Sequence, residues 1–235
     1  MDFIYWRHPT IPGIKVEEIT GGEYYKGKVW LDMARQVYCE NGREAYREIG
    51  HFKNGAPFLY GETARISITH CDGLFAVATL PSTPEVELDS FSARAALGID
   101  AERADRKQVL RIRERFLSSA ELSLVPEDDL CLNVLAWTVK EAAYKAAMTE
   151  GLDFRENIRI VRMPLLAPPV PVFDPNEYGL PATTKVLPEN YFGEVVIAAD
   201  EDLPMRLYSY MSDDFIVTLC YSPRCAKFGK ISADK

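Results

Sequence analysis

Residues 137–145 read WTVKEAAYK, a mostly apolar segment that carries three charged side chains. Trp137, Glu141 and Lys145 are four residues apart, so a helix would place them on one face. Apolar residues fall on or near the same face, namely Leu130, Val134, Tyr144 and Met148. Charges in an apolar stripe are costly unless they are paired or bind a ligand. The segment therefore indicates a helix with either a Glu141–Lys145 ion pair or a binding role.

A second group of charges lies upstream, in residues 97–102, which read LGIDAE and are typical of a short strand. Asp100 and Glu102 are two residues apart, so in a strand their side chains point to the same side. Such carboxylates suit a hard cation such as Mg²⁺, which prefers oxygen ligands. The alternative is a pair of solvated acids at a strand end.

The elements around these segments predict an α+β fold. Helices are expected at residues 27–49, at 105–117 with an Asp105–Gln108 capping box, and at 127–148. The dipeptide Asp72-Gly73 predicts a hairpin. Further strands are expected at residues 157–163, 191–200, 205–211 and 215–221. Because strands and helices are segregated along the chain, mainly antiparallel sheets are expected.

Composition narrows the classes of function. The chain has 235 residues and a formal net charge of -8, which argues against a general nucleic-acid binder. No apolar run approaches the roughly 20 residues of a membrane span, and the N-terminus has no apolar signal core. The five cysteines form no C-x-x-C pair and the three histidines do not cluster. We therefore expect a cytoplasmic protein with reduced thiols, no membrane partner and no His-rich metal centre.

Three motifs in order carry a family resemblance: GIDAE at 98–102, RFLSSAE at 115–121 and WTVKEAAYK at 137–145. Together they resemble the 4'-phosphopantetheinyl transferase superfamily, over about a fifth of the chain. The length is similar to the monomeric, surfactin-synthetase-activating type. That resemblance implies a pseudo-duplicated fold with a long helix in each half. Its halves would be residues 1–97, on the nucleotide side of coenzyme A, and 98–235, with the motifs.

The resemblance also implies a chemistry. The family transfers 4'-phosphopantetheine from coenzyme A to a serine of an apo acyl or peptidyl carrier protein and releases adenosine 3',5'-bisphosphate. By this resemblance Asp100, Glu102 and Glu141 would hold Mg²⁺ on the pyrophosphate of coenzyme A. Lys140 and Lys145 would contact its phosphates, and Glu141 would help to deprotonate the serine. Glu141 and Lys145 are then the catalytic candidates.

The N-terminal half departs from the family pattern of a G-K-P turn followed by S-H-S. Its counterparts are NGAPF at 54–58 and ITHCD at 68–72, so Ala56 replaces the lysine, and Thr69 and Cys71 replace the serines. His70 remains and by resemblance would contact a coenzyme A phosphate, although a structural imidazole is the alternative. The contacts to the nucleotide stay open.

Residues 103–115 read RADRKQVLRIRER, with six basic and two acidic side chains in an acidic protein. They form either a solvated helix face or a docking surface for an acidic carrier protein. A different class of function also remains open, in which a catalytically degenerate family member only binds carrier proteins. The sequence does not identify the carrier.

Overall fold

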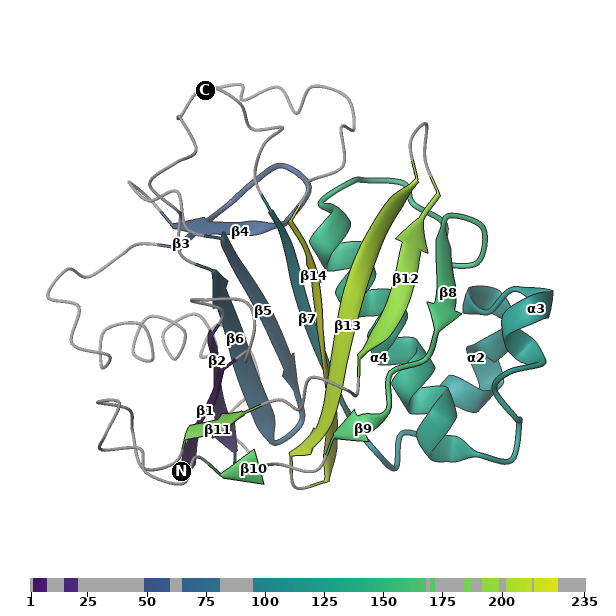
Figure 1. Ribbon diagram of the computed structural model, residues 1–235, viewed down its shortest axis with the longest axis horizontal. Coiled ribbons are helices and arrows are strands. Elements are labelled where there is room, and N and C mark those ends of the chain that lie inside the picture. Colours follow the sequence, from purple (N-terminus) through teal and green to yellow (C-terminus); the bar gives the residue numbers. More distant parts are fainter. Residues whose placement is uncertain are drawn as a thin grey trace, which may run out of the picture.

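Two six-stranded sheets, a small hairpin and three helices make up the described part of the molecule (Figure 1). The computed structural model describes residues 2–7, 15–20, 49–59, 65–80, 95–167, 170–171, 184–186, 192–198, 202–212 and 214–223. Within these ranges no helix is both long and apolar enough to cross a membrane. The free cysteines there are Cys71, Cys131 and Cys220.

The first sheet has the strand order β10-β11-β1-β2-β6-β5. Its strands are β1 (Asp2–Arg7), β2 (Lys15–Thr20), β5 (Arg65–Cys71), β6 (Leu74–Leu80), β10 (Val170–Pro171) and β11 (Thr184–Val186). All neighbouring strands are antiparallel except β1 and β11. The separate hairpin pairs β3 (Ile49–His51) with β4 (Pro57–Leu59).

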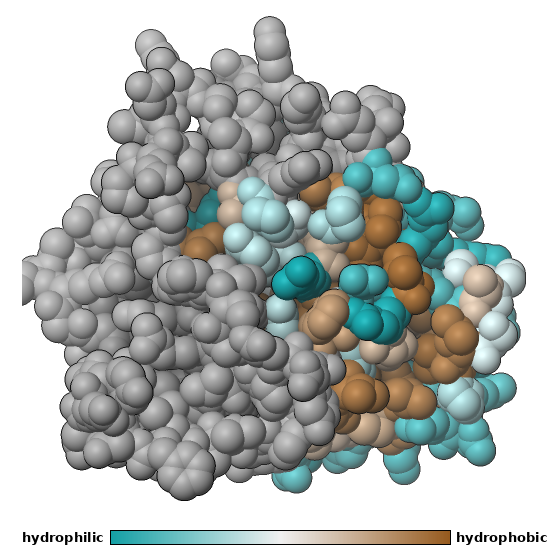
Figure 2. Space-filling model, in the orientation of Figure 1, coloured by the Kyte–Doolittle hydropathy of each residue, from teal (hydrophilic) through white to brown (hydrophobic). Residues whose placement is uncertain are grey.

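The second sheet has the order β7-β14-β13-β12-β8 and is antiparallel along this path. Its strands are β7 (Ala96–Arg103), β8 (Ile158–Arg162), β12 (Gly193–Ile197), β13 (Leu203–Ser212) and β14 (Phe215–Ser222). The short β9 (Leu166–Ala167) pairs with β13 in parallel. On the face of this sheet seen in Figure 2, hydrophobic and hydrophilic residues are intermingled.

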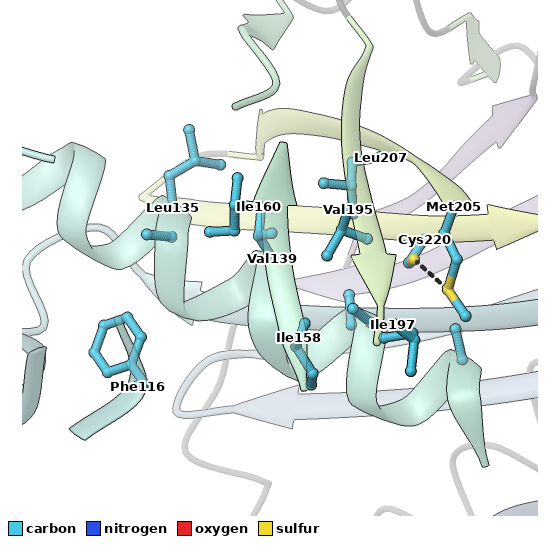
Figure 3. Packing of buried hydrophobic residues seen from close by; sticks show 14 of the residues in the cluster. Phe116, Leu135, Val139, Ile158, Ile160, Val195, Ile197, Met205, Leu207 and Cys220 are labelled. Atoms are coloured by element: carbon cyan, nitrogen blue, oxygen red, sulfur yellow. Dashed lines mark hydrogen bonds between the residues drawn. The ribbon is translucent and has the colours of Figure 1, made fainter. Parts of the chain in front are cut away.

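Helix α4 (Leu130–Ala147) packs on β7 and β14 and buries one face of the second sheet. Helices α2 (Gln108–Phe116) and α3 (Ser119–Leu122) lie at its outer side (Figure 1). The core between α4 and the sheet contains Val139, Ile158, Val195, Leu207 and other fully buried side chains (Figure 3). A second core, which includes Leu74, lies between the two sheets. The carboxylate strand β7 therefore lies between two cores.

Side-chain hydroxyls join the two sheets where their end strands, β5 and β7, run side by side. The Ser67 hydroxyl accepts a hydrogen bond from the backbone N–H of Ile99 at 3.0 Å, and the Thr69 hydroxyl accepts one from Ala101 at 3.2 Å. These bonds satisfy backbone groups that would otherwise be unpaired at a sheet edge. They also fix β5 against the strand that carries Asp100.

Many predicted elements are confirmed. The hairpin turns at Asp72-Gly73, where Gly73 has φ +94°, and the carboxylate strand, the long helix and the four later strands are all present. The predicted antiparallel character holds for most strand pairs.

One predicted helix start is wrong. No capping box forms at Asp105, because its carboxylate accepts from the Arg103 guanidinium at 3.0 Å and α2 begins at Gln108 without a side-chain cap. A capping box lies instead at Ser118 and Glu121, at the start of α3. Helix α4 ends at Ala147 with Met148 as its C-cap in the left-handed conformation, close to the predicted end at residue 148.

The division into residues 1–97 and 98–235 does not coincide with the two sheets. It would cut β7, and β10 and β11 come from the later segment but complete the first sheet. The predicted helix at 27–49 lies almost wholly outside the described residues. The expected internal duplication, with a long helix in each half, therefore stays a prediction.

Candidate active site

The carboxylates of β7 lie at the junction of the two sheets. Asp100 is 5% exposed and lies opposite Thr218 of β14, while Glu102 is only partly buried. Both line one cavity of about 270 Å³, together with His70, Lys145 and residues of the β3–β4 hairpin. As predicted from their spacing, the two carboxylates share one side of the strand.

Asp100 is held on one oxygen and unpartnered on the other. Its Oδ1 accepts from the Thr69 hydroxyl at 3.1 Å and from Lys145 Nζ at 2.7 Å. Its Oδ2 is buried and has no hydrogen-bond partner in the described structure. A buried carboxylate oxygen without a donor is costly unless a ligand satisfies it. This atom is therefore a candidate ligand atom.

Glu102 is held by two donors from outside its own strand. The indole N–H of Trp137 donates to Oε1 at 3.1 Å, and the Arg106 guanidinium donates to the same oxygen. Trp137 also packs edge-on against Phe116, with ring centroids 5.0 Å apart. Trp137 thus anchors the helix in the core, and its indole N–H has a second role at the site.

Helix α4 brings Lys145 and Glu141 to the carboxylates. This close approach depends on Gly98, because a Cβ atom there would lie 2.0 Å from the carbonyl oxygen of Ala142. Lys145 pairs with Asp100 rather than with Glu141, and its Nζ also donates to the Ile99 carbonyl at 3.1 Å. The local Glu141–Lys145 ion pair considered from the sequence is therefore replaced by a longer-range pair.

Glu141 has an unusual protonation equilibrium. Burial, reinforced by the negative charge of Asp100, raises its pKa to about 7, and Lys145 and Arg106 only partly oppose the shift. The carboxyl group is thus poised between its two protonation states near neutral pH. A group of this kind suits proton transfer, since general bases work best with a pKa near the operating pH.

His70 reaches the same cavity from the end of β5. Partial desolvation lowers the pKa of its imidazole, and the nearby positive charge of Lys145 adds to the effect while Asp100 opposes it. A neighbouring cavity of about 200 Å³ shares Gly55, Pro57 and Lys145 with the first and extends past Tyr144. The structure thus brings His70, Lys145 and the acids together, although they are far apart in the sequence.

Comparison with known proteins adds a family to this geometry. The family model of the 4'-phosphopantetheinyl transferase superfamily matches residues 96–197. Over these residues the chain is similar to that superfamily. The match extends from the start of β7 to the end of β12, and so includes both acids of β7 and all of α4. A comparison with curated proteins gives no match.

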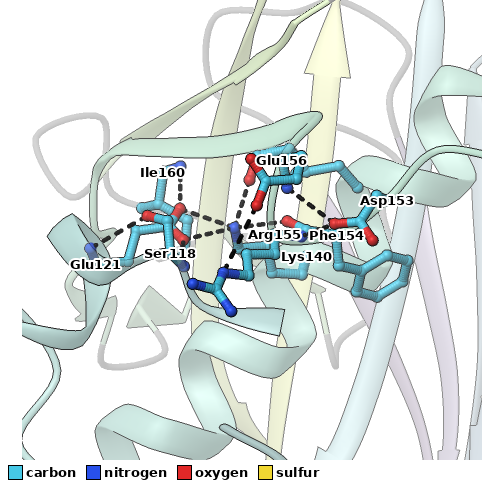
Figure 4. A network of polar contacts seen from close by, with 9 residues as sticks. Ser118, Glu121, Lys140, Asp153, Phe154, Arg155, Glu156 and Ile160 are labelled. Atoms are coloured by element: carbon cyan, nitrogen blue, oxygen red, sulfur yellow. Dashed lines mark hydrogen bonds and ion pairs between the residues drawn. The ribbon is translucent and has the colours of Figure 1, made fainter. Parts of the chain in front are cut away.

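Within the matched segment, the structure corrects the role expected for Lys140. Lys140 is 0% exposed, and its Nζ contacts both carboxylate oxygens of Glu121 at 2.7 and 2.8 Å (Figure 4). It also donates to the backbone carbonyls of Phe154 and Ile158. Burial lowers the pKa of Lys140 and the Glu121 charge opposes this. Since its three donors are engaged inside the protein, Lys140 does not reach a phosphate in this structure.

The partner of Lys140 also organises its surroundings. Glu121 accepts from the backbone N–H groups of Ser118 and Ile160, each at 2.7 Å. One carboxylate thereby connects α3, α4 and β8 (Figure 4). Glu121 is the acid that ends RFLSSAE, so the second motif of the matched segment is structural in its contacts. We assign Lys140 and Glu121 to support of the helix that carries Glu141.

The expected surface of the basic helix also needs correction. Arg113 faces inward, where Nε donates to Asn133 Oδ1 at 3.0 Å and the guanidinium bonds to the Val125 carbonyl. Arg106 is engaged by Glu102. Arg111 and Arg115 are exposed, as predicted for an outward basic face. The outward charge is therefore smaller than the sequence predicted.

The departures from the family pattern have different consequences. Thr69, in place of a serine, makes two of the bonds that hold Asp100 and β7. Cys71 is partly buried, and desolvation with the nearby Asp100 charge raises the pKa of its thiol to about 12. Ala56 lines the second cavity without offering a charge. Sequence reasoning missed the roles of Thr69 and Arg106, because neither stands in a recognisable local pattern with its partner.

The donor set fits a hard divalent cation. It consists of carboxylate oxygens, and the unpartnered Asp100 Oδ2 is a ready ligand atom. However, no group of three His, Cys, Asp or Glu side chains within the described ranges is close enough to hold a metal. Asp100, Glu102 and Glu141 would have to draw together around the ion. The predicted metal ligands are thus neighbours without being a preformed cage.

Proposed function

We propose that the protein transfers 4'-phosphopantetheine from coenzyme A to a serine of an apo acyl or peptidyl carrier protein. The observation that carries the proposal is a single cavity lined by Asp100, Glu102, His70 and Lys145, with an unpartnered buried carboxylate oxygen, inside a superfamily domain. Cationic side chains beside carboxylates suit a pyrophosphate bound with a divalent cation. We further propose that the chain works as a monomer.

In this proposal each charged group has a defined task. Asp100, Glu102 and Glu141 would hold Mg²⁺, and a bound cation would neutralise part of the charge of the pyrophosphate. Lys145 would contact a phosphate oxygen through its ammonium group. His70 would donate to a second phosphate oxygen. The adjoining cavity past Tyr144 accommodates another part of coenzyme A.

Glu141 is the proposed proton acceptor. The serine oxygen bonds to the phosphorus that carries pantetheine, the bond to the bridging pyrophosphate oxygen breaks, and adenosine 3',5'-bisphosphate leaves. The hydroxyl proton passes to the Glu141 carboxylate, whose pKa of about 7 suits this acceptance at neutral pH. Coordination to a cation would lower that pKa.

Docking of the carrier protein is proposed at α2. Arg111 and Arg115 are exposed on the helix that follows the carboxylate strand. An acidic carrier would be attracted to these charges and would bring its serine near the cavity. Because Arg113 faces inward, fewer positive charges are exposed on α2, and we expect a moderate attraction of the carrier.

A second candidate is a carrier-binding module without transfer activity. It is favoured by one observation, namely Ala56 at the turn where the family pattern has lysine. The ion pair of Asp100 and Lys145 is present and favours the catalytic function. The two functions differ in product, since a binding module would form a complex with the carrier and release no nucleotide.

The test is nucleotide release from coenzyme A in the presence of Mg²⁺ and a panel of apo carrier proteins. We expect adenosine 3',5'-bisphosphate to appear with at least one carrier, and Asp100→Asn to reduce its rate by at least about 100-fold. The matched control is Asp202→Asn, which neutralises an exposed acid paired with Arg159. Equal rates for the two variants would remove Asp100 from the reaction.

A further inference from the structure

Each carboxylate of β7 has its own internal positive charge. Lys145 pairs with Asp100 at 2.7 Å, and Arg106 pairs with Glu102. Two arginines lie within four residues of Glu102, but Arg103 is engaged elsewhere, because its guanidinium pairs with Asp105 at 3.0 Å. The contact of Arg106 with Glu102 is therefore specific.

The position of Arg106 allows it to hold and to release Glu102. Arg106 lies in the turn between β7 and α2, and its backbone N–H bonds to the Arg103 carbonyl at 3.1 Å. Its side chain is 37% exposed, whereas that of Glu102 is 13% exposed. The guanidinium also lies 6.0 Å from the centroid of the Trp137 ring. It can therefore move outward without breaking core packing, while Trp137 still donates to Glu102.

A divalent cation and Arg106 would compete for Glu102. Both carry positive charge, and like charges at the short distances of one carboxylate repel each other. Both need Glu102 oxygen atoms, and Arg106 already bonds to Oε1. The absence of a three-ligand cluster among the described side chains agrees with a Glu102 that is engaged by other partners.

We propose that Arg106 is a positioning residue that serves as an internal counter-ion of Glu102 and must be displaced when a divalent cation binds. The inference rests on the proposed metal role of Glu102. It predicts that Arg106 lowers the affinity for the cation while it keeps Glu102 ordered in the cation-free protein. Arg106 thus sets the cation concentration at which the site becomes loaded.

The test is the affinity of the full chain for Mn²⁺, measured by electron paramagnetic resonance without coenzyme A or carrier. Arg106→Gln should tighten Mn²⁺ binding by about 3- to 10-fold, the range expected when a partly exposed ion pair no longer competes. Arg106→Lys keeps the charge and should stay close to wild type. Lys107→Gln removes the same charge from the next, exposed residue and should change the affinity little.

A double-mutant cycle shows whether Arg106 acts through Glu102. Glu102→Gln should weaken Mn²⁺ binding, and adding Arg106→Gln in that background should change nothing further. If Glu102→Gln weakens binding but Arg106→Gln leaves it unchanged or weaker, the inference about Arg106 is overturned while the proposed metal site stands. If Glu102→Gln leaves Mn²⁺ binding unchanged, the metal role fails as well, and with it the basis of the inference.

Trp137 provides an independent optical readout. Displacement of Arg106 removes a cation from the neighbourhood of the indole, so Mn²⁺ and Mg²⁺ should both change the fluorescence of Trp137. The chain has three tryptophans, so the signal is assigned by subtracting the titration of Trp137→Phe. An unchanged Trp137 signal at saturating cation would contradict the displacement of Arg106.

Discussion

Replacing Lys140 by methionine separates its two possible roles, structural support and phosphate binding. The substitution keeps an unbranched apolar side chain but removes the ammonium group that contacts Glu121, Phe154 and Ile158. Glu121 would then remain as a negative charge that is 5% exposed. We therefore expect Lys140→Met to destabilise the fold.

The size of the effect follows from the burial of both partners. Removing one partner of a buried ion pair costs about 3–5 kcal/mol, because the other charge is left uncompensated. Glu121 keeps two backbone donors, from Ser118 and Ile160, so we expect about 3 kcal/mol, at the lower end of the range. In a chain of this length such a loss lowers the melting temperature by about 6–12 °C.

The assay is urea unfolding at pH 7, combined with the Michaelis constant for coenzyme A. Glu121→Gln in the Lys140→Met background removes the stranded charge and should recover part of the lost stability. If Lys140→Met unfolds like wild type and instead raises the Michaelis constant for coenzyme A many-fold, Lys140 binds phosphate and the structural assignment is refuted.

Three more predictions concern the site and its surface. Burial raises the pKa of Glu141 from 4.5 to about 7, so its carboxylate destabilises the fold increasingly as pH rises through that range. In the cation-free protein, Glu141→Gln should therefore have a free energy of unfolding up to about 3 kcal/mol above that of wild type at pH 8, and almost the same value as wild type near pH 4.5. A difference that is constant with pH would contradict this. Gly98→Ala should lower the free energy of unfolding, measured in urea, by about 3 kcal/mol or more, because its Cβ would overlap the Ala142 carbonyl. An unchanged free energy of unfolding would contradict the close packing of α4. The double substitution Arg111→Glu with Arg115→Glu should raise the Michaelis constant for the carrier by about 10-fold at low salt and leave that for coenzyme A unchanged. If the salt dependence of the Michaelis constant for the carrier stays as in wild type, the carrier docks elsewhere.

Local sequence signals predicted much of the domain. Asp72-Gly73 marks a turn that requires positive φ, and the spacing of Asp100 and Glu102 places both carboxylates on one side of a strand. The apolar face of the long helix likewise predicts its packing on a sheet. These features depend on residues close together in the chain, so sequence alone was enough to infer them.

The failures concern choices among partners that only the folded structure brings together. The spacing of Glu141 and Lys145 favours a local ion pair, but Lys145 lies nearer to Asp100, which is buried and forms the stronger contact. Lys140 was expected at a phosphate because of the family resemblance. It points to the other side of the helix, where it meets the buried Glu121.

Transferase activity is tested most directly by the intact mass of an apo carrier protein after incubation with this protein, coenzyme A and Mg²⁺. At least one carrier should gain the mass of one phosphopantetheinyl group on a serine, and EDTA should abolish the gain. Unmodified carriers throughout the panel, in the presence of a folded protein that binds them, would contradict the transferase function. A gain that persists undiminished in EDTA would contradict the role of the carboxylates as cation ligands.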